Sequence, residues 1–225
     1  MPDYILTKEN ENENESEKNK SKDKDKYWNG DNNEIETKVL ENHIYFYSSV
    51  NKKSALELNI KLREVENKLI KKYNEHNYHQ EYIYLHINSF GGSVFSAFSV
   101  IDTIKNMKIP VISIIEGAAA SAATLISVMC DYRIIYETSY MLIHQLSSGT
   151  WGKMSELQDE MENLKELMNS IRKIYKDKTN ITENEINNIL EHDLWWNAKI
   201  CLEKGLVDEI KNTDKKYKFT RGLMI

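Results

Sequence analysis

The chain has 225 residues and a formal net charge of −5, which suits one good-sized domain with tails. The excess of acidic groups excludes the basic surface that nucleic-acid binding needs. Only two cysteines, Cys130 and Cys201, are present, so we expect small buried side chains in a reducing compartment and no disulfide framework. No apolar run is long enough to span a bilayer, and the chain begins without the apolar core of a signal peptide. These features predict a cytoplasmic protein with neither a membrane nor a nucleic-acid partner.

The two ends of the chain differ in composition from the middle. Residues 1–38 consist mainly of Asn, Glu, Lys, Asp and Ser, which cannot bury enough apolar surface to offset the entropy of an ordered chain. We therefore expect a disordered polar tail there. Residues 211–225 are basic with scattered apolar side chains and predict a short basic tail. One folded domain is expected between the tails, over residues 39–210.

Short strands and helices alternate in the first half of this domain. In chain order we expect a strand at 43–47, an amphipathic helix at 55–72, a strand at 82–88, a helix beginning near 94 and a buried strand at 110–115. The first helix should bury the side that carries Leu56, Ile60 and Leu69. Strands that alternate with helices are typical of an α/β domain with mostly parallel strands and crossover helices.

The second half continues the alternation. We expect a short apolar helix at 122–129, strands at 133–136 and 141–144, a long helix at 155–176, a last helix from 198 to a C-cap glycine at 205, and a strand at 206–210. Ser155 and Gln158 have the spacing of a capping box at the start of the long helix. Thr182 and Glu185 repeat this spacing and predict the start of a further helix.

Ser121 is the first candidate for chemistry. A predicted strand ends in small residues at 117–120, and the serine stands where the following helix begins. This position exposes a hydroxyl and directs backbone N–H groups toward any oxyanion that forms there. Taken alone, residues 116–123 favour a plainer interpretation, in which the serine caps an Ala-rich helix.

Three further positions are weak signals individually. Gly91 and Gly92 follow a strand and permit close backbone approach, so they either supply a second N–H group to the same oxyanion or form an ordinary turn. His144 closes an apolar strand, where a histidine is more often structural than a catalytic base. Asp193 fits a carboxylate near a helix end as well as it fits a catalytic residue.

Four motifs, in order, resemble those of the Clp protease proteolytic-subunit (ClpP) family. Residues 87–94, INSFGGSV, resemble the family segment INSPGGSV, and residues 117–122, GAAASA, resemble its nucleophile motif GxAASM. Residues 141–145, MLIHQ, are similar to the segment around its catalytic histidine. Residues 193–208, DLWWNAKICLEKGLVD, resemble the stretch from its catalytic aspartate to the closing EAxxYGLVD. The resemblance extends over most of the predicted domain.

This resemblance implies a crotonase-like α/β fold of the ClpP type, with the long helix at 155–176 as a protruding handle. It implies a serine endopeptidase in which Ser121 is the nucleophile, His144 the base and Asp193 the residue that orients the imidazole. The N–H groups of Gly92 and Ala122 would form the oxyanion hole.

The resemblance also implies polypeptide substrates, bound as a strand beside Gly91 and the residues after the histidine, Gln145 and Leu146. The family assembles into two stacked heptameric rings around a proteolytic chamber. The chain has no GxxxxGK[ST] phosphate-binding loop, so a separate AAA+ ATPase would have to unfold the substrates. No cofactor and no metal is implied.

Several residues depart from the family pattern. Phe90 and Leu146 stand where the family has prolines, and both lie where the substrate should run. Ala122 replaces a methionine, which keeps the N–H group but should make the wall of the substrate pocket smaller. His192 stands where the family has an arginine that helps to hold the rings together.

Two other functions are compatible with parts of the pattern. A ring subunit with a structural or regulatory role would keep the same fold with little activity, although all three triad positions hold competent residue types. A crotonase acting on acyl-CoA thioesters would also use paired N–H groups at Gly91 and Gly92, but it leaves Ser121, His144 and Asp193 as coincidence.

Overall fold

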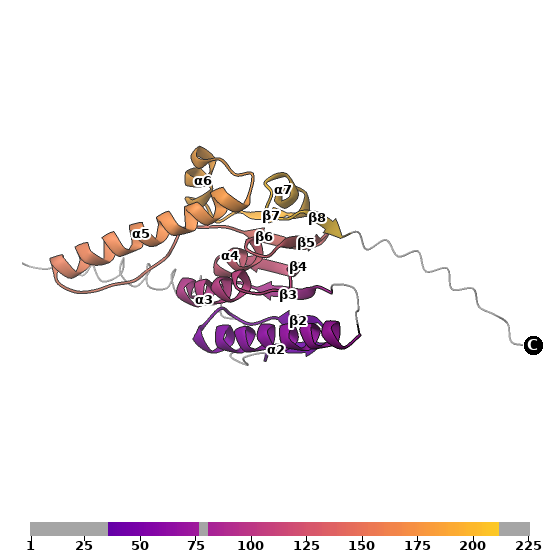
Figure 1. The fold of residues 1–225 in the computed structure, drawn as a ribbon. Coiled ribbons are helices and arrows are strands. Elements are labelled where there is room, and N and C mark those ends of the chain that lie inside the picture. The colour runs from indigo at the N-terminus through magenta and orange to yellow at the C-terminus, as the bar shows by residue number, and fades with distance from the viewer. Residues whose placement is uncertain (1–35, 77–80, 212–225) are drawn as a thin grey trace, which may run out of the picture. The chain divides into compact units, whose positions relative to one another are not determined.

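The computed structural model describes residues 36–76 and 81–211 (Figure 1). The described strands are β1 (Lys38–Leu40), β2 (His43–Phe46), β3 (Ile83–Ser89), β4 (Val111–Ala120), β5 (Tyr132–Tyr136), β6 (Tyr140–Leu142), β7 (Trp195–Asn197) and β8 (Glu209–Lys211). The described helices are α2 (Lys52–His76), α3 (Val94–Lys105), α4 (Ala122–Val128), α5 (Met154–Lys178), α6 (Glu183–Leu190) and α7 (Ala198–Glu203). The two predicted tails lie outside the described residues except at their inner ends.

The strands form one mixed sheet in the order β1-β2-β3-β4-β5-β8. Every pair from β2 to β8 along this path is parallel, and β1 adds an antiparallel edge to β2. The predicted α/β architecture with mostly parallel strands is therefore confirmed.

β4 pairs with two different strands along its length. It pairs with β5 over residues 112–115 and with β6 over residues 118–120. Gly117 lies between the two paired segments with φ 79°, and its N–H donates to Ser139 Oγ at 2.8 Å. β6 in turn pairs with the antiparallel β7. The short strands β6 and β7 thus continue the sheet beside the end of β4.

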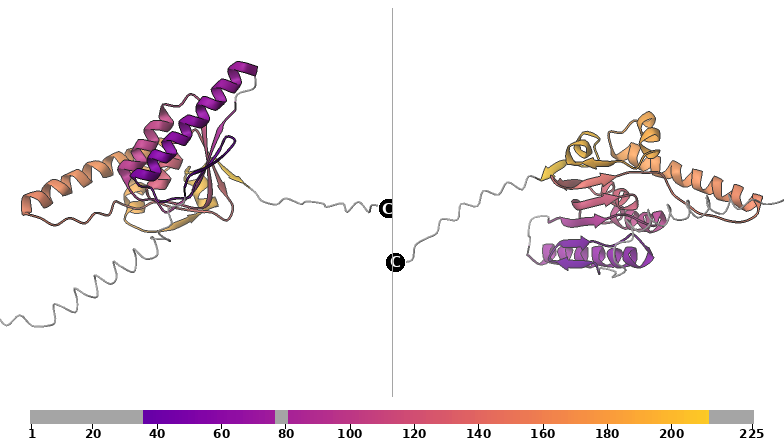
Figure 2. Two further views of the ribbon diagram at one scale, coloured as in Figure 1. Left: turned by 90° about the horizontal axis from the view of Figure 1, so that it is seen from below. Right: turned by 180° about the vertical axis from the view of Figure 1, so that it is seen from behind.

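Helices α2, α3 and α4 lie against one face of this sheet (Figures 1 and 2). α2 buries Leu58, Leu62 and Leu69, at the spacing of one helical face. The expectation that Leu56 and Ile60 share this face with Leu69 is wrong, since their exposed fractions are 61% and 48%.

α5 extends beyond the sheet and the other helices, as the protruding handle was predicted to do (Figures 1 and 2). Among its residues only Ile171 and Tyr175, both near its C-terminal end, are buried. The helix begins one residue before the predicted capping serine. Its N-cap is Lys153, whose N–H donates to the Glu156 carboxylate at 2.9 Å, so the expected pairing of Ser155 with Gln158 is wrong. The second predicted capping box, Thr182 with Glu185, is confirmed at the start of α6.

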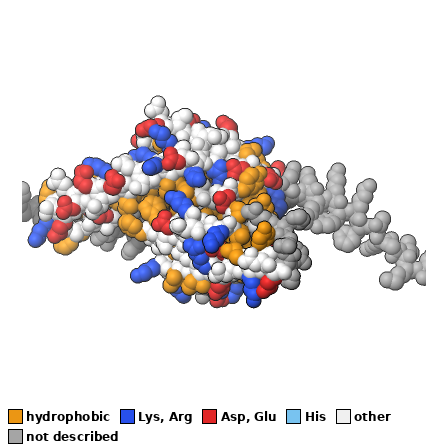
Figure 3. Space-filling view, in the orientation of Figure 1, with side chains coloured by type: hydrophobic (Ala, Val, Ile, Leu, Met, Phe, Trp, Pro, Cys, Tyr) orange, Lys and Arg blue, Asp and Glu red, His pale blue; other side chains and the backbone are white. Residues whose placement is uncertain are grey.

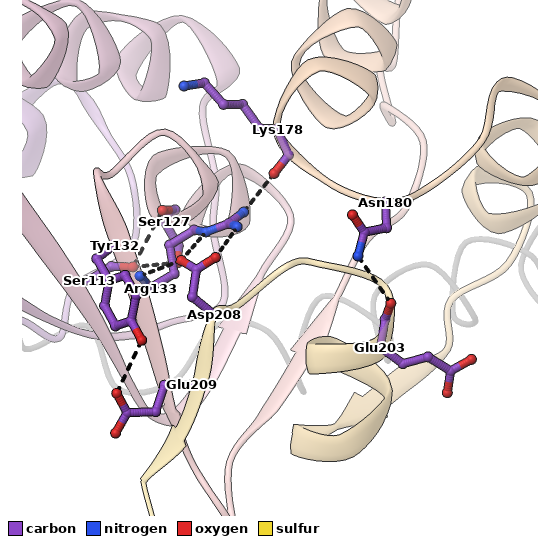
Figure 4. A network of polar contacts seen from close by, with 9 residues as sticks. All are labelled: Ser113, Ser127, Tyr132, Arg133, Lys178, Asn180, Glu203, Asp208 and Glu209. Carbon is purple, nitrogen blue, oxygen red and sulfur yellow. Dashed lines mark hydrogen bonds and ion pairs between the residues drawn. The ribbon is translucent and has the colours of Figure 1, made fainter.

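A partly buried ion pair and its hydrogen bonds connect β5, the segment before β8 and the C-terminal end of α5 (Figure 4). The Arg133 guanidinium of β5 donates to both carboxylate oxygens of Asp208, at 2.9 and 2.7 Å, and also to the Lys178 carbonyl at 2.7 Å. The Arg133 main-chain N–H donates to the same carboxylate at 2.9 Å. Partial burial raises the pKa of Asp208, but the hydrogen bonds and charge of Arg133 outweigh this and lower the pKa. Bidentate pairs of this kind fix geometry as well as adding stability.

Candidate active site

The end of β4 and its two short neighbours bring three separate parts of the sequence to one edge of the sheet. The row of residues in register there is Ala120 in β4, Leu142 in β6 and Trp195 in β7. Ser121 follows this row directly, and His144 lies two residues beyond it. Asp193 lies two residues before it, in the segment that leads into β7, and because β7 runs antiparallel to β6 this segment extends beyond the row in the same direction. The register therefore places all three candidate triad residues beyond one edge.

Ser121 occupies a tight strand-to-helix turn with a backbone conformation that is rare for a residue with a side chain. Its φ is 54° and its ψ is −126°, and α4 begins at the next residue. The Ser121 N–H donates to the Leu142 carbonyl at 2.9 Å, which ties the turn to β6. No side-chain capping bond is made by Ser121. The simple capping interpretation of this serine therefore does not hold, and the turn resembles the strained positions that cluster at functional sites.

The glycine pair lies directly against this turn. A Cβ atom built on Gly91, which has φ 91°, would lie 2.8 Å from Ser121 Cβ and 2.9 Å from the Ala122 nitrogen. Gly92, with φ 141°, is held by a parallel bridge to Val50. Both glycines are thus needed for close backbone approach, and Gly91 brings the loop against the peptide that follows the serine.

His144 and Asp193 lie near each other, with 3.7 Å between Nδ1 and Oδ1. The histidine side chain is 23% exposed and the carboxylate is 63% exposed. Burial lowers the pKa of His144 below its ordinary value of 6.5, and the charge of Asp193 opposes this shift. A histidine with a lowered pKa is neutral at physiological pH, which is the form that accepts a proton.

The other predicted site residues make main-chain contacts within the domain. The Gln145 N–H donates to the Leu190 carbonyl at 3.0 Å, and the Leu146 N–H points to Met168 Sδ at 3.3 Å. The Gly91 carbonyl accepts from the Val50 N–H at 2.7 Å. Ala122, expected to form a pocket wall, is only 1% exposed and packs in the core.

Two contacts near the site were not foreseen from the sequence. Phe90 and Trp195 form an edge-to-face ring pair with centroids 6.0 Å apart, beside Gly91 and the end of β7. Thr124 joins the Ser121 carbonyl to Tyr175 of α5. The pairing of Phe90 with Trp195 and that of Thr124 with Tyr175 have no local sequence signal, because the partners lie far apart in the chain.

Among the described residues, no group of three or more His, Cys, Asp and Glu side chains is arranged to hold a metal ion. In the same part of the chain, none of the helices is long and apolar enough to cross a membrane.

Comparisons with known proteins agree with this architecture. A family model described as Clp protease matches residues 32–214. The ATP-dependent Clp protease proteolytic subunit 2 of Treponema denticola is 33% identical over 135 residues, which cover 59% of this chain and 68% of that protein. The ATP-dependent Clp protease proteolytic subunit of Streptococcus mutans is 35% identical over 137 residues, which cover 59% of this chain and 70% of that protein.

A solved structure extends the comparison to the fold. A ClpP1 mutant from Listeria monocytogenes aligns with a TM-score of 0.67 and 21% identity, over 77% of this chain and 93% of that one. The fold is thus an α/β domain of the ClpP type. Since the family match spans most of the sequence, the chain belongs to the Clp protease family.

Proposed function

We propose that the chain is a serine endopeptidase subunit in which Ser121 Oγ attacks the carbonyl carbon of a peptide bond. His144 takes the hydroxyl proton as the new C–O bond forms and gives it to the leaving nitrogen as the C–N bond breaks. Asp193 keeps the Nδ1 proton of the imidazole directed toward its carboxylate, which leaves Nε2 to accept from the serine. Water then hydrolyses the acyl-enzyme with the same residues.

The observation that carries this proposal is the shared position of the three side chains beyond the row formed by Ala120, Leu142 and Trp195. The lowered pKa of His144 supports it, because the base is then neutral at the pH of the cell. The left-handed backbone of Ser121 supports it too, since strain of this kind persists only where the surroundings impose it.

The N–H groups of Gly92 and Ala122 are the proposed oxyanion hole. The Gly91 backbone comes so near the Ala122 nitrogen that an added Cβ would lie 2.9 Å from it, and this proximity supports a pairing of the two loops around one oxygen atom. Main-chain donors fixed in this way need no reorganisation when negative charge develops in the transition state.

Polypeptide substrates would lie between Gly91 and the segment that includes Gln145 and Leu146. Because several N–H and C=O groups there already have partners, we propose that the substrate pairs through the remaining main-chain groups. Phe90 and Trp195 lie beside this path as an aromatic wall.

We also propose the family's assembly, two stacked heptameric rings served by a separate AAA+ ATPase. The names of the relatives, which describe ATP-dependent proteases, support the ATPase. Exposed apolar side chains support association, since a monomer would leave them in water. They are Leu56 and Ile60 on α2, Phe95 on α3, Trp151 in the segment before α5, and Met154 and Met161 in the N-terminal half of α5. Figure 3 shows hydrophobic side chains among charged ones over one face of the domain.

The test of the proposed reaction is labelling of Ser121 by a fluorophosphonate, together with cleavage of a fluorogenic peptide. Ser121→Ala should abolish both, with a loss of several powers of ten in kcat. The matched control is Ser99→Ala, which changes an exposed serine of α3 and should retain wild-type labelling. Native mass spectrometry of both variants checks that assembly is preserved.

The outcomes separate the alternative functions. Peptide cleavage that survives in Ser121→Ala contradicts the assignment of the nucleophile. A wild-type ring that neither labels nor cleaves is a structural subunit. Turnover of an acyl-CoA thioester without peptide cleavage would identify a crotonase.

A further inference from the structure

A chain of three polar groups connects α5 to the peptide that follows the nucleophile. Tyr175 OH lies 2.5 Å from Thr124 Oγ1, and Thr124 Oγ1 lies 2.6 Å from the Ser121 carbonyl oxygen. Tyr175 is 2% exposed and Thr124 is fully buried. Buried hydroxyls must find partners inside the protein, so this arrangement is fixed by the fold and not by solvent.

The donor and acceptor capacities of the three groups determine the direction of both hydrogen bonds. A carbonyl oxygen only accepts, so the Thr124 hydroxyl must donate to Ser121. The single proton of that hydroxyl is then committed, and the Tyr175 hydroxyl must donate to Thr124. Burial raises the pKa of Tyr175, which keeps the donor protonated. The Ser121 carbonyl accepts a second hydrogen bond from the Thr124 N–H at 3.0 Å.

The Ser121 carbonyl, which these hydrogen bonds hold, belongs to the same peptide unit as the Ala122 N–H. The described peptide bonds include no cis bond, so this unit is planar with its C=O and N–H pointing in opposite directions. Fixing the oxygen therefore fixes the direction of the Ala122 N–H. Hydrogen bonds that the oxygen accepts also polarise the amide and make its N–H a stronger donor.

We propose that Thr124 and Tyr175 are positioning residues that aim the Ala122 N–H at the oxyanion, an inference that rests on the proposed function. The strained backbone of Ser121 gives them a reason to be present, because a conformation of this kind persists only where its surroundings hold it. Since Tyr175 comes from α5, the oxyanion donor is also connected to the protruding helix.

The structure offers a matched control on the same helix. Ser127 of α4 and Ser113 of β4 form a fully buried hydroxyl pair at 3.0 Å, also drawn in Figure 4. This pair resembles the one between Thr124 and Tyr175 in burial and chemistry, but it bonds neither Ser121 nor Ala122. Ser127→Ala should therefore lower the melting temperature without changing the reaction rate.

The test measures the rate of fluorophosphonate acylation, kcat and KM for a peptide, and the affinity of a peptide boronate, whose tetrahedral adduct occupies the oxyanion hole. Tyr175→Phe keeps the ring and removes one hydroxyl. We expect it to slow acylation and kcat about three- to tenfold, as for one lost hydrogen bond, with KM unchanged. Boronate binding should weaken by the same factor. Thr124→Val should lose more, Thr124→Ser should restore the rate, and the double variant should be no slower than Thr124→Val alone.

Two results would overturn the inference while leaving the proposed function intact. One is wild-type acylation in Tyr175→Phe and Thr124→Val. The other is an equal slowing in Ser127→Ala, which would show that buried hydroxyls act only through stability. A wild-type protein that is not acylated and cleaves no peptide refutes both the inference and the proposed function, and the wild-type measurement alone identifies that case.

Discussion

Replacing Gly91 with alanine should damage the site more than its small size suggests. The added Cβ would lie 2.5 Å from the Ala120 carbonyl oxygen, 2.8 Å from Ser121 Cβ and 2.9 Å from the Ala122 nitrogen. All three contacts involve the backbone or the first side-chain carbon of the nucleophile, so no flexible side chain can move aside. The backbone of Gly91 also has φ 91°, which L-residues rarely adopt.

Two terms contribute to the expected loss of stability. A left-handed backbone costs a residue with a Cβ about 1–2 kcal/mol. Crowding a packed position adds about 1–3 kcal/mol. A total of roughly 2–5 kcal/mol corresponds to a melting temperature lowered by roughly 5–15 °C for a domain of this size. Because the clash falls on the nucleophile and its neighbours, a displacement of about 1 Å should slow acylation on the order of a hundredfold.

The assay is thermal unfolding of the Gly91→Ala variant together with its rate of fluorophosphonate acylation. The control is Gly149→Ala, where an added Cβ meets no heavy atom within 4 Å. That change should leave stability within about 0.5 kcal/mol of wild type. If Gly91→Ala melts and reacts like Gly149→Ala, the close packing of the glycine loop on Ser121 does not matter for the site.

Two predictions concern charge. Since burial lowers the pKa of His144, the acylation rate should rise with pH through an inflection below 6.5 and then level off. The charge of Asp193 opposes this shift, so Asp193→Asn should move the inflection to lower pH and reduce the plateau rate. An acylation rate independent of pH between 4 and 8 would contradict the role of His144 as the base. Asp208→Asn should destabilise the fold by about 1–3 kcal/mol at neutral pH, because Arg133 then loses a charged partner. The pKa of Asp208 is lowered in the fold, so this contribution is present above its ordinary value of 3.8 and is lost as pH falls below it. Melting curves of wild type and Asp208→Asn should therefore converge in acid, and a constant difference would show that packing is responsible.

Most of the described helices and strands were predictable from the sequence, because each depends on short-range patterns, but the strands β1 and β7 were not expected. One error arose where a local pattern competed with tertiary packing, and another where two local capping patterns competed. Leu56 and Ile60 fit an apolar stripe with Leu69, but the sheet lies on the other side of α2 and leaves them exposed. Ser155 and Gln158 have capping-box spacing, yet the Glu156 carboxylate accepts from the Lys153 N–H, so the helix is capped two residues earlier.

The candidate site was predictable only as a set of motifs. Nothing in the sequence states that Leu142 pairs with both Ala120 and Trp195, although this register is what brings His144 and Asp193 toward Ser121. The contact of Thr124 with Tyr175 could not be predicted for the same reason, since the two residues are 51 positions apart. Long-range pairing of this kind leaves no trace in periodicity or propensity.

Departures from the family motifs fall on side chains outside the proposed triad, whereas the proposed oxyanion hole and substrate pairing depend on main-chain groups. Ala122 replaces a methionine, but its side chain is 1% exposed and packs in the core, so the change leaves its N–H in place. Phe90 replaces a proline, and its ring is 46% exposed beside Trp195. The first change should therefore affect neither the oxyanion hole nor the reaction. The second should alter which peptides bind, because an aromatic wall favours substrates with apolar side chains next to the glycine loop.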